Sequence, residues 1–240
     1  MTGYTCLPTP VKFVVMSITE KYQQLRAEIP EHVTIVLAAK TRTAEEVAEA
    51  IAAGATDIGE NYVQEAEEIY HALGAQAKRV RWHSIGAIQT NKINKALEIF
   101  DVFQTVDSLK HARALNTRAA RIEKVLPVYI EVNIGAESSK AGIPPEYGKL
   151  EHLVHEMAQL ENLKIEGLMT MGPLSEDPEV SRPYFRAAKT MFDQLRAVDI
   201  PNVNMHVLSM GMSASYQVAI EEGATMVRLG TIVFGERYYA

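Results

Sequence analysis

A lysine at the end of an apolar run is the residue of this chain with the clearest chemical potential. Lys40 closes the run 33–39, and the segment that begins at Thr41 has the composition of a helix start. Burial disfavours the ammonium form of a lysine, and a neutral amine is a nucleophile that forms a Schiff base with an aldehyde. A surface lysine that merely follows a strand is the alternative interpretation, and for a lone lysine it is the commoner one.

Two segments near the C-terminus have the composition of phosphate-binding loops. The segment 209–213 brings two serines and a glycine directly before a predicted helix, and the segment 227–231 ends a predicted strand in Gly230-Thr231. Backbone N–H groups at a helix start can bind an anion, and the helix dipole favours negative charge there. Taken singly, each segment is better explained as an ordinary N-cap. An aldehyde-capturing lysine combined with a distant phosphate site indicates pyridoxal 5′-phosphate (PLP).

Three further side chains are candidates for contact with such a cofactor. Arg228 lies within a predicted strand, where burial requires a partner, either a carboxylate of the fold or the pyridine nitrogen of PLP. Because an arginine stays charged, the second pairing would leave the ring nitrogen unprotonated and the ring a weak electron sink. His83 is explained more simply as a core histidine, and Asn61 could orient a ring substituent or be a turn residue.

The elements that must position these residues alternate between apolar runs and helical patterns, after a first helix over about 17–28. Strands are predicted over 33–39, 55–59, 80–86, 101–106, 126–134, 163–171, 204–210 and 224–229, and each is followed by a helix, over 43–53, 61–73, 90–98, 108–123, 145–160, 180–197, 213–222 and 231–236. Near-continuous Val, Ile and Leu runs are typical of parallel strands buried on both faces.

This alternation predicts an α/β fold, a single (β/α)8 TIM-type barrel with an extra N-terminal helix. A doubly wound open sheet would show the same alternation. Two features favour the barrel: no Gly-x-Gly-x-x-Gly motif follows the first strand, and polar residues end nearly all the strands. The carboxyl ends of barrel strands are where such folds place their sites, with phosphate after strands 7 and 8.

Composition limits the class of protein. The chain has 240 residues, 47% of them hydrophobic, and a net charge of −6, which argues against nucleic acid as a partner. Its single cysteine, Cys6, cannot form an internal disulfide, so a cytoplasmic location is expected. No apolar run is long enough to span a membrane, and no spacing of residues indicates a metal site. Residues 1–16 are expected to be a disordered leader, with Met16 an alternative start, and residues 17–240 to form the barrel.

Many segments together resemble one known family, the PLP homeostasis proteins, over residues 17–238. The matching segments are Ala39-Lys40-Thr41, Ile58-Gly59-Glu60-Asn61-Tyr62-Val63-Gln64-Glu65, the stretch 82–92 from Trp82 to Lys92, Val132-Asn133-Ile134 with 137–142, Gly167-Leu168-Met169, 208–213, 227–231 and Phe234-Gly235-Glu236-Arg237. The family resembles the N-terminal domain of bacterial alanine racemase.

The resemblance implies how PLP would be held: as an internal aldimine on Lys40, with Arg228 at the pyridine nitrogen and Asn61 near the ring. It also implies that Ser209, the backbone of Met210 and Gly211, and Gly230 with Thr231 hold the phosphate. We include His83 among the candidate cofactor-binding residues. Family members carry or buffer PLP, support vitamin B6 and amino-acid homeostasis, and show no robust catalytic activity.

A PLP-dependent enzyme of the amino-acid racemase type is the rival function. Racemisation needs an acid or base on each face of the substrate carbon, and Lys40 supplies only one of them. Alanine racemase takes the second from a further domain, which a chain that ends at Ala240 is not expected to contain. We therefore expect a monomeric PLP carrier, with PLP-dependent apoenzymes as candidate recipients.

Overall fold

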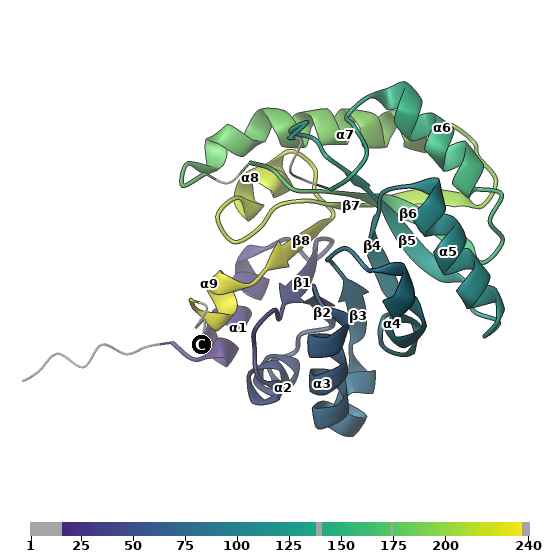
Figure 1. Ribbon diagram of the computed structural model, residues 1–240. Coiled ribbons are helices and arrows are strands. Elements are labelled where there is room, and N and C mark those ends of the chain that lie inside the picture. The colour runs from purple at the N-terminus through teal and green to yellow at the C-terminus, as the bar shows by residue number, and fades with distance from the viewer. Residues whose placement is uncertain (1–15, 138–140, 174, 237–240) are drawn as a thin grey trace, which may run out of the picture.

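The computed structural model describes residues 16–137, 141–173 and 175–236. In these ranges eight strands close into a parallel barrel in chain order (Figure 1). The strands are β1 (Thr34–Ala38), β2 (Asp57–Glu60), β3 (Arg81–Ser84), β4 (Val102–Val106), β5 (Leu126–Val132), β6 (Leu163–Thr170), β7 (Val203–Ser209) and β8 (Met226–Leu229). The leader predicted over 1–16 lies, apart from Met16, outside the described residues.

Helices surround the strands, as Figure 1 shows. They are α1 (Ile18–Glu28), α2 (Ala44–Ala52), α3 (Val63–Leu73), α4 (Ile93–Ile99), α5 (Leu109–Ala120), α6 (Tyr147–Met157), α7 (Arg182–Arg196), α8 (Tyr216–Glu221) and α9 (Thr231–Phe234). Three short 3-10 helices cover Gly74–Arg79, Thr90–Lys92 and Pro178–Ser181. None of the helices in the described ranges is long and apolar enough to cross a membrane.

The closure of the barrel confirms the predicted fold. Strand β1 pairs in parallel with β8 from Thr34↔Met226 to Leu37↔Leu229, so the sheet has no free edge between its first and last strands. A doubly wound sheet would leave both strands as edges. The extra N-terminal helix is α1, which packs against α2 and α9. All eight predicted strand–helix units are therefore present.

Local sequence signals explain where several helices begin. Ser17 and Glu20 form a capping box at α1, and Thr43 and Glu46 form a second one at α2. The Ser108 hydroxyl accepts a hydrogen bond from a backbone N–H in the first turn of α5. These caps set the ends of the strand–helix loops, and thus the positions from which site residues project.

The strands have two differently filled faces. Outward-facing side chains such as Leu37 and Ile58 pack under the helices in one large apolar cluster. A smaller apolar cluster fills the barrel interior and includes Val36, Tyr129 and Met169. Polar side chains share that interior: Asp57, His83, Gln104, Ser209 and Arg228 are all buried. A barrel core normally holds bulky apolar residues, so this polar set requires an explanation.

Candidate functional site

A cavity of about 430 Å³ lies at the carboxyl ends of the strands. Its wall includes five of the nine residues that the sequence predicts, Lys40, Asn61, Arg228, Gly230 and Thr231. Ala38, Ile85, Met171, Gly172, Met212, Ser213 and Ala214 complete the lining. Residues from both ends of the chain thus meet because β1 and β8 are neighbours in the closed barrel.

Lys40 directly follows β1, and the backbone holds it at the cavity. The Ala39 N–H donates to the Gly59 carbonyl at 2.9 Å, which extends the β1–β2 pairing almost to Lys40. The next residue, Thr41, has a φ of 64°, and its N–H donates to a carboxylate oxygen of Glu65 at 3.2 Å. The half-buried Lys40 side chain places its ammonium nitrogen 5.1 Å from the centre of the Tyr62 ring, a cation–π contact.

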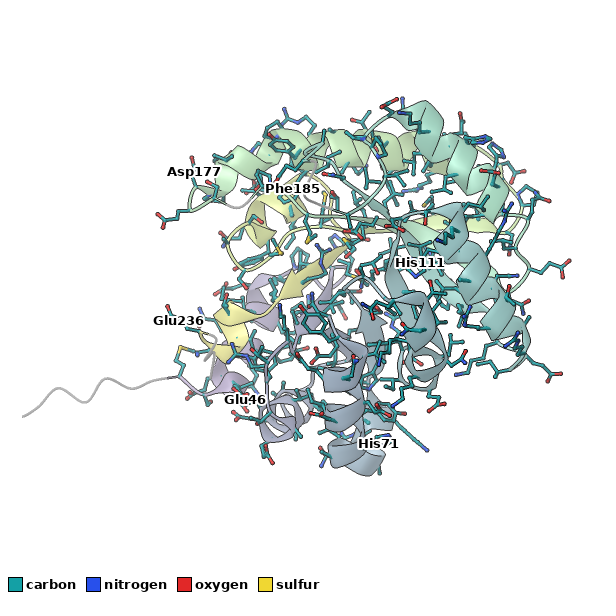
Figure 2. The ribbon with its side chains drawn as sticks, in the orientation of Figure 1. Glu46, His71, His111, Asp177, Phe185 and Glu236 are labelled. Carbon is teal, nitrogen blue, oxygen red and sulfur yellow. The ribbon has the colours of Figure 1, made fainter. Side chains whose placement is uncertain are left out.

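Arg42 ties the loop that carries Lys40 to the C-terminal helix α9. Its buried guanidinium donates to the carbonyl oxygens of Phe234, Gly235 and Glu236 at 3.3, 2.6 and 3.2 Å. It also forms an ion pair with Glu46 at 3.5 Å. Glu46 and Glu236 accordingly lie on the same side of the molecule in Figure 2. The loop after β1 and the helix after β8 are thereby fastened together.

Ser213 belongs to the loop between β7 and α8, and its side chain reaches the start of α9. Its hydroxyl oxygen accepts hydrogen bonds from the N–H groups of Gly230 at 3.2 Å and Ile232 at 3.4 Å. The sequence predicts a helix over 213–222 with an ordinary N-cap in the segment 209–213, and this start was wrong because the Ser213 hydroxyl binds these two N–H groups instead. Helix α8 begins only at Tyr216, with Ser215 as its N-cap. Ser213 is therefore a site residue that the predicted set did not include.

The other predicted phosphate-binding residues lie deeper. Ser209 is fully buried, and its hydroxyl donates to Oε1 of Gln104 at 2.7 Å. The N–H of Met210 donates to the Met226 carbonyl at 3.1 Å, and Gly211 turns the chain with a φ of 91°. A role in phosphate binding for Ser209, Met210 and Gly211 thus stays a prediction.

Arg228 is buried without a described carboxylate within 4.0 Å of its guanidinium. It donates from Nη1 to the Ser209 hydroxyl at 2.7 Å and from Nη2 to the Thr170 carbonyl at 2.9 Å. Burial lowers the pKa of Arg228 to about 10, against the opposing influence of Glu131, so it remains a cation at neutral pH. The sequence allowed a direct ion pair between Arg228 and a carboxylate of the fold. In the structure, two uncharged acceptors take the place of that carboxylate.

His83 is a fully buried histidine in the barrel interior, with both ring nitrogens paired. Nε2 lies 2.7 Å from Oδ1 of Asp57, and Nδ1 lies 2.9 Å from Nε2 of Gln104. This agrees with the interpretation as a core histidine, and a direct contact between His83 and a cofactor stays a prediction.

A buried carboxyl group beside the site has no counterpart among the predicted residues. Glu60 ends β2, is fully buried, and its Oε1 has no hydrogen-bond partner among the described residues. Burial, reinforced by the charge of Glu65, raises the pKa of Glu60 to about 8, although the Asn61 N–H and Lys40 oppose this shift. The sequence places Glu60 in a segment that matches the family, but nothing in its neighbours reveals that its carboxyl group is buried.

Comparison with known proteins gives the same family as the sequence motifs. A family model described as the alanine racemase N-terminal domain matches residues 15–238. The pyridoxal phosphate homeostasis protein of Aquifex aeolicus is 42% identical over 202 residues, which are 84% of this chain and 86% of that protein. The chain belongs to the pyridoxal phosphate homeostasis protein family.

Solved structures agree with this assignment. The structure of PipY from Synechococcus elongatus PCC7942 with PLP bound has a TM-score of 0.83 and 32% identity, and the match covers 91% of this chain and 100% of that one. An alanine racemase of Clostridium difficile 630 has a TM-score of 0.76 at 18% identity, and the match covers 93% of this chain but 57% of the racemase. At that identity the racemase shares the fold alone.

Proposed function

We propose that this protein binds PLP covalently through Lys40 and acts as a carrier or buffer of PLP in vitamin B6 and amino-acid homeostasis. The observation that carries the proposal is a buried guanidinium, Arg228, without a described carboxylate within ion-pair distance, in the wall of a cavity that also contains a lysine amine. A buried charge needs compensation by hydrogen bonds or by a ligand. The names of the relatives and the PLP in PipY support the same ligand.

The residues of the cavity fit PLP chemically. Lys40 supplies the amine, and Arg228 supplies N–H donors for a ring nitrogen. The Ser213 hydroxyl, whose oxygen accepts from the N–H groups of Gly230 and Ile232, supplies its own proton as a donor for a phosphate. A volume of about 430 Å³ lies within the range of small-ligand sites. When bound, PLP supplies an aldehyde that reacts reversibly with amines.

The charge of Arg228 favours storage of PLP, or racemase-like chemistry, over transamination. A guanidinium only donates hydrogen bonds and keeps its protons, so it leaves the ring nitrogen without a proton and with a reduced capacity to withdraw electrons. The half-buried Lys40 leaves the attachment point within reach of water and of acceptor amines. We propose PLP-dependent apoenzymes of the cytoplasm as the recipients and a monomer as the carrier.

Titration of the purified full chain with PLP tests the proposal. We expect one PLP per chain and, after borohydride reduction and digestion, a single modified peptide that contains Lys40, because Lys40 lines the cavity. Mass spectrometry identifies the peptide. Modification spread over several surface lysines, or no saturable binding, would contradict the proposed function.

A second prediction concerns the phosphate group. Ser213→Ala is expected to weaken PLP binding by about tenfold, because a lost hydrogen bond to a charged group is worth about 1.5 kcal/mol. Binding of pyridoxal, which lacks the phosphate, is expected to change little. Ser215→Ala, in the same loop, is the matched control, and equal losses for PLP and pyridoxal in Ser213→Ala would place the phosphate elsewhere.

A further inference from the structure

Four consecutive hydrogen bonds cross the barrel interior from Arg228 to Asp57. The Nη1 of Arg228 lies 2.7 Å from the Ser209 hydroxyl, which lies 2.7 Å from Oε1 of Gln104. The Nε2 of Gln104 lies 2.9 Å from Nδ1 of His83, whose Nε2 lies 2.7 Å from Oδ1 of Asp57. The five side chains come from β8, β7, β4, β3 and β2, and all are buried.

The chemistry of its two ends gives this hydrogen-bond chain one direction. A guanidinium only donates, so the Ser209 oxygen accepts from Arg228 and its own proton goes to Gln104. The amide of Gln104 therefore points its oxygen to Ser209 and its nitrogen to Nδ1 of His83, with a further contact to the sulfur of Met226 at 3.3 Å. His83 then carries its proton on Nε2 and donates it to Asp57. The opposite amide orientation would leave an unprotonated Nε2 of a neutral His83 facing a carboxylate.

The protonation states at the far end agree with this direction. Burial lowers the pKa of His83, which keeps its ring neutral with a single proton, although Asp57 opposes the shift. Burial alone would raise the pKa of Asp57, but hydrogen bonds from His83 and Thr56 and the positive charge of Arg81 hold it below its ordinary value. The Thr56 hydroxyl and Nε of Arg81 bind Asp57 at 2.7 and 2.8 Å. Asp57 is therefore an anion at one end of this series of hydrogen bonds, and Arg228 is a cation at the other end.

We infer that Asp57, His83, Gln104 and Ser209 are positioning residues, which together hold the Arg228 guanidinium in one orientation. The inference rests on the proposed function in one respect, namely that PLP is the ligand to which Arg228 donates. With Nη1 held by Ser209 and Nη2 by the Thr170 carbonyl, the guanidinium cannot rotate without breaking a buried hydrogen bond. Its remaining N–H groups are left for a ligand in the cavity.

A chain of polarised hydrogen bonds also sets how strongly Arg228 donates. Each bond in such a chain strengthens its neighbours in a low-dielectric interior. Asp57 lines a separate cavity, of about 590 Å³, that also includes the start of β1 and residues of α1. The orientation of Arg228 at the cavity that contains Lys40 thus depends on hydrogen bonds that reach as far as this separate cavity. This dependence is a functional reason for the buried polar side chains, which are unusual in the interior of a barrel.

Replacement of Gln104 by leucine tests the inference, because it interrupts the chain in the middle without touching the cavity residues named above. We expect Gln104→Leu to raise the dissociation constant for PLP about tenfold and to shift the absorption maximum of the bound cofactor. Thr105→Val is the matched control: it lies on the same strand, is equally buried, and loses one hydrogen bond, from its hydroxyl to the Gly86 carbonyl at 2.9 Å. It is expected to keep the parental spectrum.

A measurement on the PLP-free protein separates this inference from the proposed function. Nitrogen chemical shifts of His83 are expected to show a neutral ring protonated on Nε2, with the Nδ1 signal displaced in Gln104→Leu. A His83 ring protonated on Nδ1 would contradict the proposed direction of the hydrogen bonds, whether or not PLP binds. If PLP binds the parent and Gln104→Leu matches Thr105→Val in both affinity and spectrum, the positioning role is refuted while PLP binding stands.

Discussion

Replacement of Lys40 by alanine is expected to abolish covalent attachment of PLP while the barrel remains folded. The side chain projects beyond the end of β1 and contacts the Tyr62 ring, so its loss removes little core packing. Without the covalent bond, Arg228 and the donors around Ser213 still attract PLP. We expect the affinity to fall at least ~100-fold, which corresponds to about 2.7 kcal/mol.

The loss is measured by absorbance titration and by borohydride reduction followed by mass spectrometry. Lys95→Ala is the matched control, because that exposed lysine pairs with Glu67 on the outer surface at 2.8 Å. Circular dichroism verifies that both variants fold. An adduct of unchanged stoichiometry in Lys40→Ala would show that another amine is the principal attachment point.

The second large effect is expected from Glu60→Gln, as a change in the pH dependence of stability. In the folded protein the pKa of Glu60 is raised to about 8, chiefly by burial, whereas the unfolded chain has an ordinary carboxyl group. A raised carboxyl pKa contributes stability below the unfolded value, and this contribution is lost as the pH rises toward 8. The parent should therefore lose stability between about pH 5 and pH 8, and the glutamine variant should lose less, because only the contribution of Glu60 is removed.

Urea unfolding at pH 5 and pH 8 measures the difference. At pH 8 we expect Glu60→Gln to exceed the parent by on the order of 2 kcal/mol in free energy of unfolding, with near equality at pH 5. Glu68→Gln, on the exposed side of α3, controls for the loss of a carboxylate as such. A parent with the same pH profile as Glu60→Gln would mean that water reaches this carboxyl group.

The architecture was predictable because its signals are local and repeated. Near-continuous apolar runs such as 33–39 indicate parallel strands buried on both faces, and caps such as Ser108 mark helix starts. Once the barrel is inferred, Lys40 and Gly230 must approach each other, because every strand end lies on the same face and β8 closes on β1. These residues were predictable from fold geometry alone.

The details that escaped prediction depend on side-chain direction and on partners distant in sequence. The loop 209–213 offers two serines, and the turn at Gly211 sends one into the core and the other to α9, a choice that composition does not reveal. Gln104 lies in the run Val-Phe-Gln-Thr-Val, and nothing nearby marks it as a bridge between His83 and Ser209, which are 21 residues before it and 105 residues after it.

The Arg42 contacts have a consequence for release of a ligand. One guanidinium joins the loop that carries Lys40 to the end of α9, the helix that follows Gly230, so two walls of the cavity are fastened at a single point. Fraying of α9 would break the carbonyl contacts of Arg42 and loosen both walls together, without opening any strand of the barrel. Helix α9 and the loop that carries Lys40 are therefore expected to open together, as one latch on the cavity.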